Sequence, residues 1–184
     1  MTTEREYCRD LKLTWQAFSL DTPDVLEQKQ IDVKGLFGNL KDVINVSSAF
    51  LETLTKDVKI EDCESVASTA EPSIGKGFLL HAETMKKVYT EYCINHDRAE
   101  QLLEKYEQQV PEVQKLLQRS VESLQTQVVC FNMGSILIKP VQRILKYPLI
   151  LNELIKVSIH FIYFLSNCWK EFGSYDVESK PQYP

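Results

Sequence analysis

The chain has 184 residues, 43% of them hydrophobic, and this length predicts a single domain with one sizeable core. Its 26 acidic residues against 21 Lys and Arg give a net charge of −5, which argues against nucleic acid or an anionic membrane surface as the main partner. The five cysteines include no CxxC pair, so we expect reduced thiols in a cytosolic protein rather than a zinc or redox centre.

Two helices are predicted in the first third of the chain. Thr3 and Glu6 have the spacing of a capping box, and apolar residues follow at steps of three and four, which predicts a helix over residues 3–19. Asp32 is the predicted N-cap of a second, long helix, whose apolar side continues to Leu54.

Residues 59–73 lose this periodicity and gather acidic residues, Ser and Pro, which predicts a loop. A third helix is expected from about Lys76, a turn at residues 95–97, a fourth helix after that turn, and a further helix that begins at Pro111. The fold class is therefore all-α, an elongated antiparallel helical bundle. Four aromatic side chains lie in the apolar sectors and are predicted to be buried in the core: Trp15, Phe18, Phe37 and Tyr89.

The sequence contains no recognisable motif for covalent catalysis. The three histidines are far apart, and GxSxG and HExxH do not occur. The segment IGKGF looks like part of a phosphate-binding loop, but Ala70 and Gly77 stand where that motif needs Gly and Ser or Thr. We therefore expect no catalytic residues, no metal site and no cofactor.

The most apolar stretch of the chain extends from Val157 to Trp169. It is shorter than the roughly 20 residues that span a bilayer. The N-terminal residues are charged and do not resemble a signal peptide. We expect no integral membrane span and a cytoplasmic protein.

The segment SILIKPVQRILKYPLILNELIK, residues 135–156, has the spacing of an amphipathic helix but contains Pro140 and Pro148. Pro140 fits the start of a helix, whereas Pro148 is expected to bend it. Three cations share one sector: Lys139, Arg143 and Lys146. The broader remainder is predicted to pack and holds Val141, Ile144, Leu145, Pro148, Leu151, Leu154 and Ile155. The cations are either solvated on an ordinary surface helix or dock a partner protein.

This segment resembles the third conserved region of the Dbl-homology (RhoGEF) domain, the helical module of guanine-nucleotide exchange factors for Rho-family GTPases. The segment TEREYCRDL, residues 3–11, resembles the end of the first conserved region, and the segment from IGKGF to LEKY resembles the second. The resemblance covers residues 3–156 and is similar to the Tuba-like factors. It implies a Dbl-homology-like domain over residues 1–156 and an atypical C-terminal tail over 157–184.

The resemblance implies a regulatory exchange factor that binds a Rho-family small GTPase of the Cdc42, Rac or Rho type, without covalent chemistry. Lys139 aligns with the family lysine that contacts switch II, and Gln142 and Arg143 match the motif beside it. Lys146 and Tyr147 are assigned partly to support of the helix. Further along the helix, two residues are candidates for GTPase selectivity: Leu151 and Ile155.

The sequence departs from the family pattern at both ends. The family's switch I glutamate lies about one turn before Thr3, and its last helix is replaced by an apolar tail, expected to be helical to about Trp169 and disordered from about Gly173. These departures are typical of a truncated or alternative isoform and predict reduced exchange activity. The alternative function is a non-catalytic helical interaction module that binds a GTPase or another protein without exchange.

Overall fold

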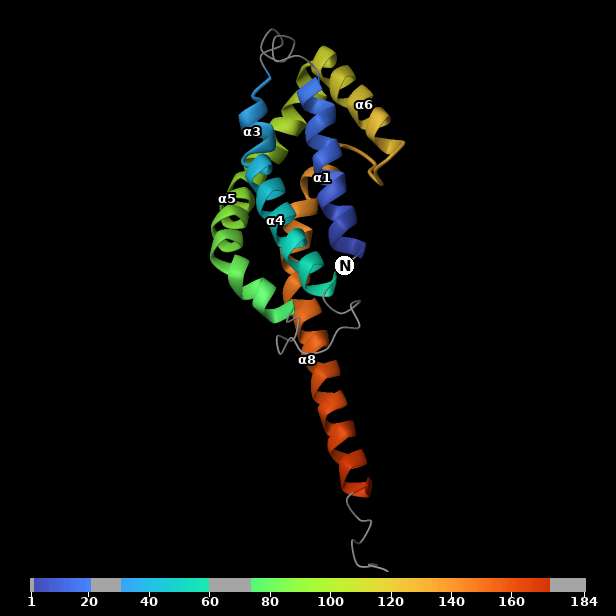
Figure 1. Ribbon diagram of the computed structural model, residues 1–184. Helices are drawn as coiled ribbons and strands as arrows, with labels where there is room; N and C mark the ends of the chain where they lie inside the picture. Colours follow the sequence, from blue (N-terminus) through green and yellow to red (C-terminus); the bar gives the residue numbers. More distant parts are fainter. Residues whose placement is uncertain (1, 21–30, 60–73, 173–184) are drawn as a thin grey trace, which may run out of the picture. The chain divides into compact units, whose positions relative to one another are not determined.

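The computed structural model describes residues 2–20, 31–59 and 74–172. Within these ranges the chain forms helices and short connections and contains no strand, which confirms the predicted all-α class. The helices are α1 (Thr2–Leu20), α3 (Val33–Phe37), α4 (Leu40–Lys59), α5 (Ile74–Gln109), α6 (Pro111–Gln125), α7 (Met133–Leu137) and α8 (Lys139–Phe172) (Figure 1). The chain divides into two units, Met1–Gln142 and Arg143–Pro184, and each is described by itself.

Helix α1 forms where the capping box and the apolar periodicity predicted it. Tyr7, Leu11, Thr14 and Phe18 follow one another at steps of four, three and four residues, and all four are buried. This spacing places them on one face of the helix. The Thr14 hydroxyl donates to the carbonyl of Asp10 at 2.8 Å, so the one polar member of the row is satisfied within the helix.

The second predicted helix is in fact two helices, α3 and α4. Asp32 caps α3 as predicted, because its carboxylate accepts a hydrogen bond from the Gly35 amide at 2.7 Å. The helix then ends at Phe37, and Gly38 adopts φ +54° and ψ −133°, a backbone conformation that L side chains rarely adopt. The prediction of one uninterrupted helix was wrong because Gly38 redirects the chain before α4 begins.

Gly38→Ala is expected to lower the free energy of unfolding by about 1–3 kcal/mol, because a Cβ atom strains this backbone conformation. Gly134→Ala is the matched control. Gly134 lies within α7, and a Cβ there meets its nearest neighbours at 3.6 and 3.7 Å, which is ordinary contact. The control is expected to be about 0.4–1 kcal/mol more stable than the wild type. Urea unfolding measures both, and equal stabilities for the two variants would contradict the assignment.

Helix α5 is continuous, so the predicted turn at residues 95–97 was wrong. The buried face of the helix passes straight through this region, with Tyr92, His96, Ala99 and Leu103 at steps of four, three and four residues. Burial along this face outweighs the weak helix propensity of Asn and Asp. The predicted loop before α5 falls almost entirely on residues 60–73, which lie outside the described residues.

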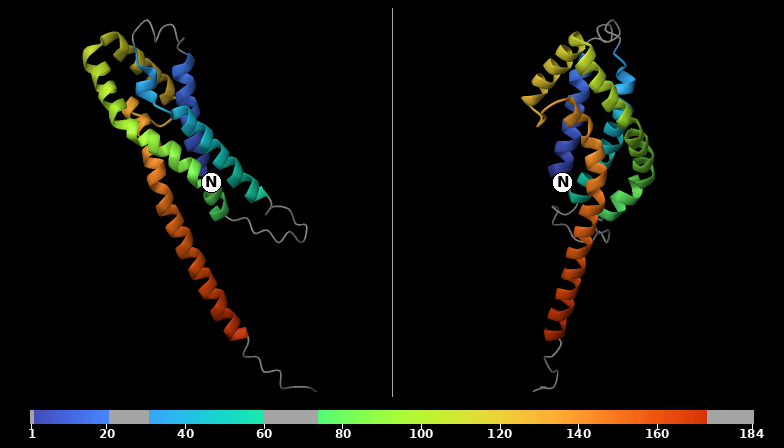
Figure 2. Two further views of the ribbon diagram at one scale, coloured as in Figure 1. Left: turned by 90° about the vertical axis from the view of Figure 1, so that its left-hand side faces the viewer. Right: turned by 180° about the vertical axis from the view of Figure 1, so that it is seen from behind.

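Helix α6 begins at Pro111 as predicted, and Figure 2 shows the chain reversing direction between α5 and α6. The short helix α7 is fixed by a capping box between Asn132 and Ser135. Pro140 lies in the first turn of α8, as expected, and Pro148 lies inside the helix. Helix α8 ends at Phe172, beyond the predicted limit, and the expected disorder from Gly173 falls outside the described residues.

The core of the first unit forms where α4 packs against α1 and α5 (Figure 1). The Tyr89 hydroxyl on α5 lies 3.0 Å from the Tyr7 hydroxyl on α1 and 2.9 Å from the Ser47 hydroxyl on α4, so one buried phenol joins three helices. Burial is confirmed for three of the four aromatic residues predicted in the core: Phe18, Phe37 and Tyr89. Trp15 is only half-buried and contacts Phe37 edge to face, with ring centroids 6.2 Å apart.

Candidate functional site

Lys139, the first residue of α8, makes an ion pair within the first unit. Its Nζ atom lies 2.9 Å from Oδ2 of Asp10 on α1, and the two side chains are only 19% and 15% exposed. Arg9 contacts the other carboxylate oxygen of Asp10 at 3.2 Å. The Lys139 ammonium is therefore already engaged inside the chain, where it holds the start of α8 against α1.

Gln142 ends the first unit with an exposed side chain. Its backbone amide donates to the carbonyl of Ile138 at 3.0 Å, so the main chain is satisfied by the helix. Among the sequence-predicted site residues of the first unit, Gln142 is the one whose side chain is exposed and available to a partner.

Arg143 begins the second unit and is buried, with 9% of its surface exposed. Its guanidinium carbon lies 5.2 Å from the centroid of the Tyr147 ring, one helical turn further on, and Tyr147 is 4% exposed. This is a cation–π geometry between neighbours on one helix face. Arg143 is therefore not part of a solvated cationic stripe, and its position suits a role in fixing the helix.

Lys146 is exposed, and no hydrogen bond or ion pair is found for its ammonium among the described residues. Exposed apolar side chains lie on both sides of it along α8: Leu145 (66% exposed), Leu149 (65%), Ile155 (55%) and Val157 (66%). Leu151 is half-buried. Of the three predicted cations, Lys146 alone combines exposure with the absence of a described partner.

The predicted orientation of residues 139–156 was therefore wrong in one respect. The apolar sector was expected to pack and the cationic sector to face solvent. In the structure, Arg143 and Tyr147 are buried while Leu145 and Ile155 are exposed. A helical projection gives the angle between side chains but not which sector faces inward, and long Arg and Tyr side chains have apolar bodies that tolerate burial.

The described thiols and phenol with shifted pKa values are not activated for chemistry. Burial raises the pKa of the Cys93 thiol and of the Cys130 thiol, and at Cys130 the nearby Lys139 opposes this only in part. Burial also raises the pKa of Tyr92, whose hydroxyl donates to the carbonyl of Leu137 at 2.8 Å. A nucleophile requires the opposite shift, because the deprotonated form is the reactive one.

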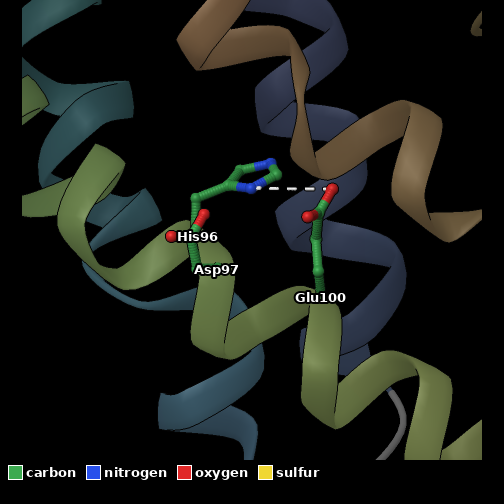
Figure 3. A group of neighbouring side chains, drawn as sticks. All are labelled: His96, Asp97 and Glu100. Atoms are coloured by element: carbon green, nitrogen blue, oxygen red, sulfur yellow. Dashed lines mark ion pairs between the residues drawn. The ribbon is translucent and has the colours of Figure 1, made fainter.

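Three polar side chains gather on α5: His96, Asp97 and Glu100 (Figure 3). His96 Nδ1 lies 3.8 Å from Glu100 Oε1, which is longer than a hydrogen bond, and the buried His96 Nε2 has no partner in the described part of the chain. All three come from one helix, where residues four apart are ordinary neighbours, and both carboxylates are exposed. We assign this group no metal.

None of the helices in the described part of the chain is both long and apolar enough to cross a membrane. The described residues thus form an all-helical module with an exposed polar and apolar helix face and with raised thiol pKa values. This arrangement places the described part of the chain in the class of all-α helical-bundle modules. Its family follows from comparison with known proteins: the RhoGEF domain model matches residues 1–160. The chain belongs to the RhoGEF (Dbl-homology) family, whose members are regulatory exchange factors.

Individual relatives agree with this assignment. The chain is 40% identical over 158 residues to dynamin-binding protein of Mus musculus, covering 84% of this chain and 9% of that protein. It is 35% identical over 161 residues to Rho guanine nucleotide exchange factor 38 of Mus musculus, covering 83% of this chain and 20% of that protein. The chain therefore spans a small part of these relatives.

A solved structure shows the same fold. That structure is of the Vav1 exchange factor and was described for the structural role of its PH and C1 domains. The TM-score is 0.68 at 25% identity, and the match covers 84% of this chain and 39% of that one. The helical architecture described above is therefore also present in that solved structure.

Proposed function

We propose that this chain is a guanine-nucleotide exchange factor for a Rho-family small GTPase of the Cdc42, Rac or Rho type, acting in the cytoplasm. The observation that carries the proposal is the exposed part of α8. There, Lys146 presents a cation without a described partner, and Ile155 presents an apolar side chain further along the same helix. Membership of the RhoGEF family supports the same function.

The chemistry of such an exchange needs no covalent step. A surface that binds the nucleotide-free GTPase more tightly than the nucleotide-bound form shifts the equilibrium toward the empty state. It also lowers the barrier to nucleotide release, by the logic with which an enzyme binds a transition state more tightly than a substrate. The module for this activity corresponds to residues 1–156, and residues 157–184 form a C-terminal tail.

Within this proposal the six site residues have different roles. Lys146 and Gln142 contact the GTPase directly, since both side chains are exposed. Lys139 positions the start of α8 through Asp10 on α1, and Arg143 supports α8 locally by packing against the Tyr147 ring one turn further on. The remaining two contribute to GTPase selectivity: Leu151 and Ile155. With Lys139 and Arg143 engaged inside the chain, fewer cations reach the partner, which supports a reduced exchange activity.

The test is the release of fluorescent GDP from Cdc42, Rac and Rho, each with and without the 184-residue chain. Faster release from at least one GTPase is the expected result. The alternative function, binding without exchange, is favoured by the engagement of Lys139 and Arg143. It predicts a complex with the nucleotide-free GTPase at unchanged release rates. If all three GTPases release GDP at their intrinsic rates and none forms a complex, both functions are excluded.

The ion pair between Lys139 and Asp10 is expected to contribute about 1.5–3 kcal/mol to stability, because it is a charge-assisted hydrogen bond in a half-buried setting. A double-mutant cycle with Lys139→Ala and Asp10→Ala, followed by urea unfolding, isolates this coupling. Lys146→Ala is the control and is expected to leave stability within about 0.5 kcal/mol of the wild type, because the side chain is exposed. Additive effects of the two substitutions would show that the ion pair between Lys139 and Asp10 does not contribute to stability.

A further inference from the structure

A cavity of about 280 Å³ lies within the first unit, at the C-terminal part of α5, the adjacent face of α6 and the segment that leads into α7. Leu117, Val121 and Met133 are buried among its lining residues and give it an apolar floor. Glu107, Glu122 and Phe131 are exposed and form its rim. The volume lies just below the roughly 300–1,000 Å³ of small-molecule sites, so it suits one or two side chains of a protein segment.

Phe131 stands out on this rim because its side chain is 84% exposed while its backbone is fixed. Its amide donates to the Ser135 hydroxyl at 3.0 Å, and the Gln125 side-chain amide donates to its carbonyl at 3.4 Å. The same Gln125 amide donates to the carbonyl of Cys130 at 3.2 Å. Because the backbone that carries this ring is already held in position, a partner that covers the ring does not also have to order the main chain.

The residues that lead to Phe131 alternate between buried and exposed. Val128 and Cys130 are buried, whereas Val129, like Phe131, is 84% exposed. Val129 and Phe131 are two large, exposed apolar side chains two positions apart, and Phe131 lines the cavity, so they differ from the scattered single exposures that are normal on a protein surface. This grouping is typical of an interaction surface, in which a buried aromatic residue supplies much of the binding energy.

The negative charge at the rim of the cavity favours a partner with positively charged side chains. Glu107 and Glu122 are the charged residues that line the cavity, and the other polar lining residues are neutral amides, one of which, Gln118, donates to Glu122 at 3.0 Å. Carboxylates at the rim repel anionic lipid head groups and attract Lys or Arg. A membrane surface is therefore disfavoured as the occupant, although exposed Val and Phe side chains would otherwise suit one.

We propose that this surface, formed by the cavity together with Val129 and Phe131, docks a cationic amphipathic segment of a partner protein. One large apolar side chain of the segment enters the cavity beside Phe131, and its Lys or Arg residues meet Glu107 and Glu122. All of the residues that form this surface lie between positions 107 and 133, and none belongs to α8. The proposal is therefore independent of the exchange function and holds whether or not a GTPase binds.

The probe for the test is a fluorescein-labelled synthetic peptide of Leu and Lys residues in amphipathic order, with a counterpart in which Glu replaces Lys. Fluorescence anisotropy measures their binding to the full 184-residue chain. The Lys peptide is expected to bind, and Phe131→Ala and Glu122→Lys are each expected to weaken its binding by about tenfold or more. The Glu peptide is expected not to bind.

Glu91→Lys is the matched control for net charge, because Glu91 is an exposed carboxylate on α5 that does not line this cavity. It is expected to leave the affinity unchanged. Amide chemical-shift changes on peptide addition are expected around Phe131 and Met133. The proposal is overturned by equal binding of the two peptides, by an equal loss in Glu91→Lys and Glu122→Lys, by unchanged affinity in Phe131→Ala, or by peptide-induced shifts confined to other regions.

Discussion

Tyr89→Ala is expected to lower the free energy of unfolding by about 3–5 kcal/mol, the usual cost of removing a fully buried aromatic ring. Tyr89 is 2% exposed, and its hydroxyl is shared with Tyr7 on α1 and Ser47 on α4. The substitution removes the packing of the ring and also leaves two buried hydroxyl groups without this partner. For a domain whose total stability is about 5–15 kcal/mol, this loss leaves little margin.

Two further variants separate the contributions of the ring and of its hydroxyl. Tyr89→Phe keeps the ring and removes only the hydrogen bonds, so its expected cost is about 1–3 kcal/mol. Phe131→Ala removes an aromatic ring that is 84% exposed and is expected to change stability by less than about 0.5 kcal/mol. Urea unfolding followed by circular dichroism measures all three. A Tyr89→Ala protein that unfolds like the wild type would show that the three-helix junction does not hold the core together.

The helices of this chain could be predicted from sequence wherever apolar spacing and burial agree. The spacing of Thr3 and Glu6 and the apolar residues after them indicated the extent of α1, although its buried row contains Thr14 where Trp15 was expected, and Pro111 marked the start of α6. The break at Gly38 carried a local signal too, since Gly followed by Asn is typical of a turn. The apolar periodicity on both sides of Gly38 concealed this signal, because it continues through α3 into α4.

The opposite error occurred in α5. Asn95 and Asp97 have weak helix propensity and were taken to indicate a turn, yet His96 between them is 7% exposed and belongs to the buried face. Propensity is a small term of at most about 0.7 kcal/mol per ordinary residue, and burial of a continuous face outweighs it. A single sequence does not show which His is buried, so the helix could not be predicted as continuous from its residues alone.

The environment of the candidate site was less predictable than the segment that contains it. The resemblance located α8, but Lys139 and its partner Asp10 are 129 positions apart, and no local pattern links them. Exposure likewise depends on tertiary packing, which is why Arg143 and Tyr147 turned out to be buried and Lys146 exposed. The resemblance therefore named six candidates, and the structure separates the exposed ones, such as Lys146, from the buried Arg143 and the ion-paired Lys139.

Lys146→Ala is expected to slow GDP release from the cognate GTPase by roughly 10- to 100-fold relative to the wild-type chain. The physical reason is the loss of a charge-assisted contact worth about 1.5–3 kcal/mol, made more strongly with the nucleotide-free than with the nucleotide-bound GTPase. Each increase of about 1.36 kcal/mol in the activation free energy slows the release tenfold. The thermal melting curve is expected to stay unchanged, because Lys146 is exposed and no intramolecular partner is found for it among the described residues.

Two other lysines of α8 provide the controls. Lys156 is 71% exposed and pairs with Glu153 at 2.8 Å, and Lys156→Ala is expected to leave both exchange and stability unchanged. Lys139→Ala is expected to lower stability, and to lower exchange only as far as the start of α8 loosens from Asp10. The assignment of the contact to Lys146 is refuted if Lys139→Ala abolishes exchange at unchanged stability while Lys146→Ala exchanges normally. That pattern would mean that the GTPase displaces Asp10 from Lys139 and binds its ammonium instead.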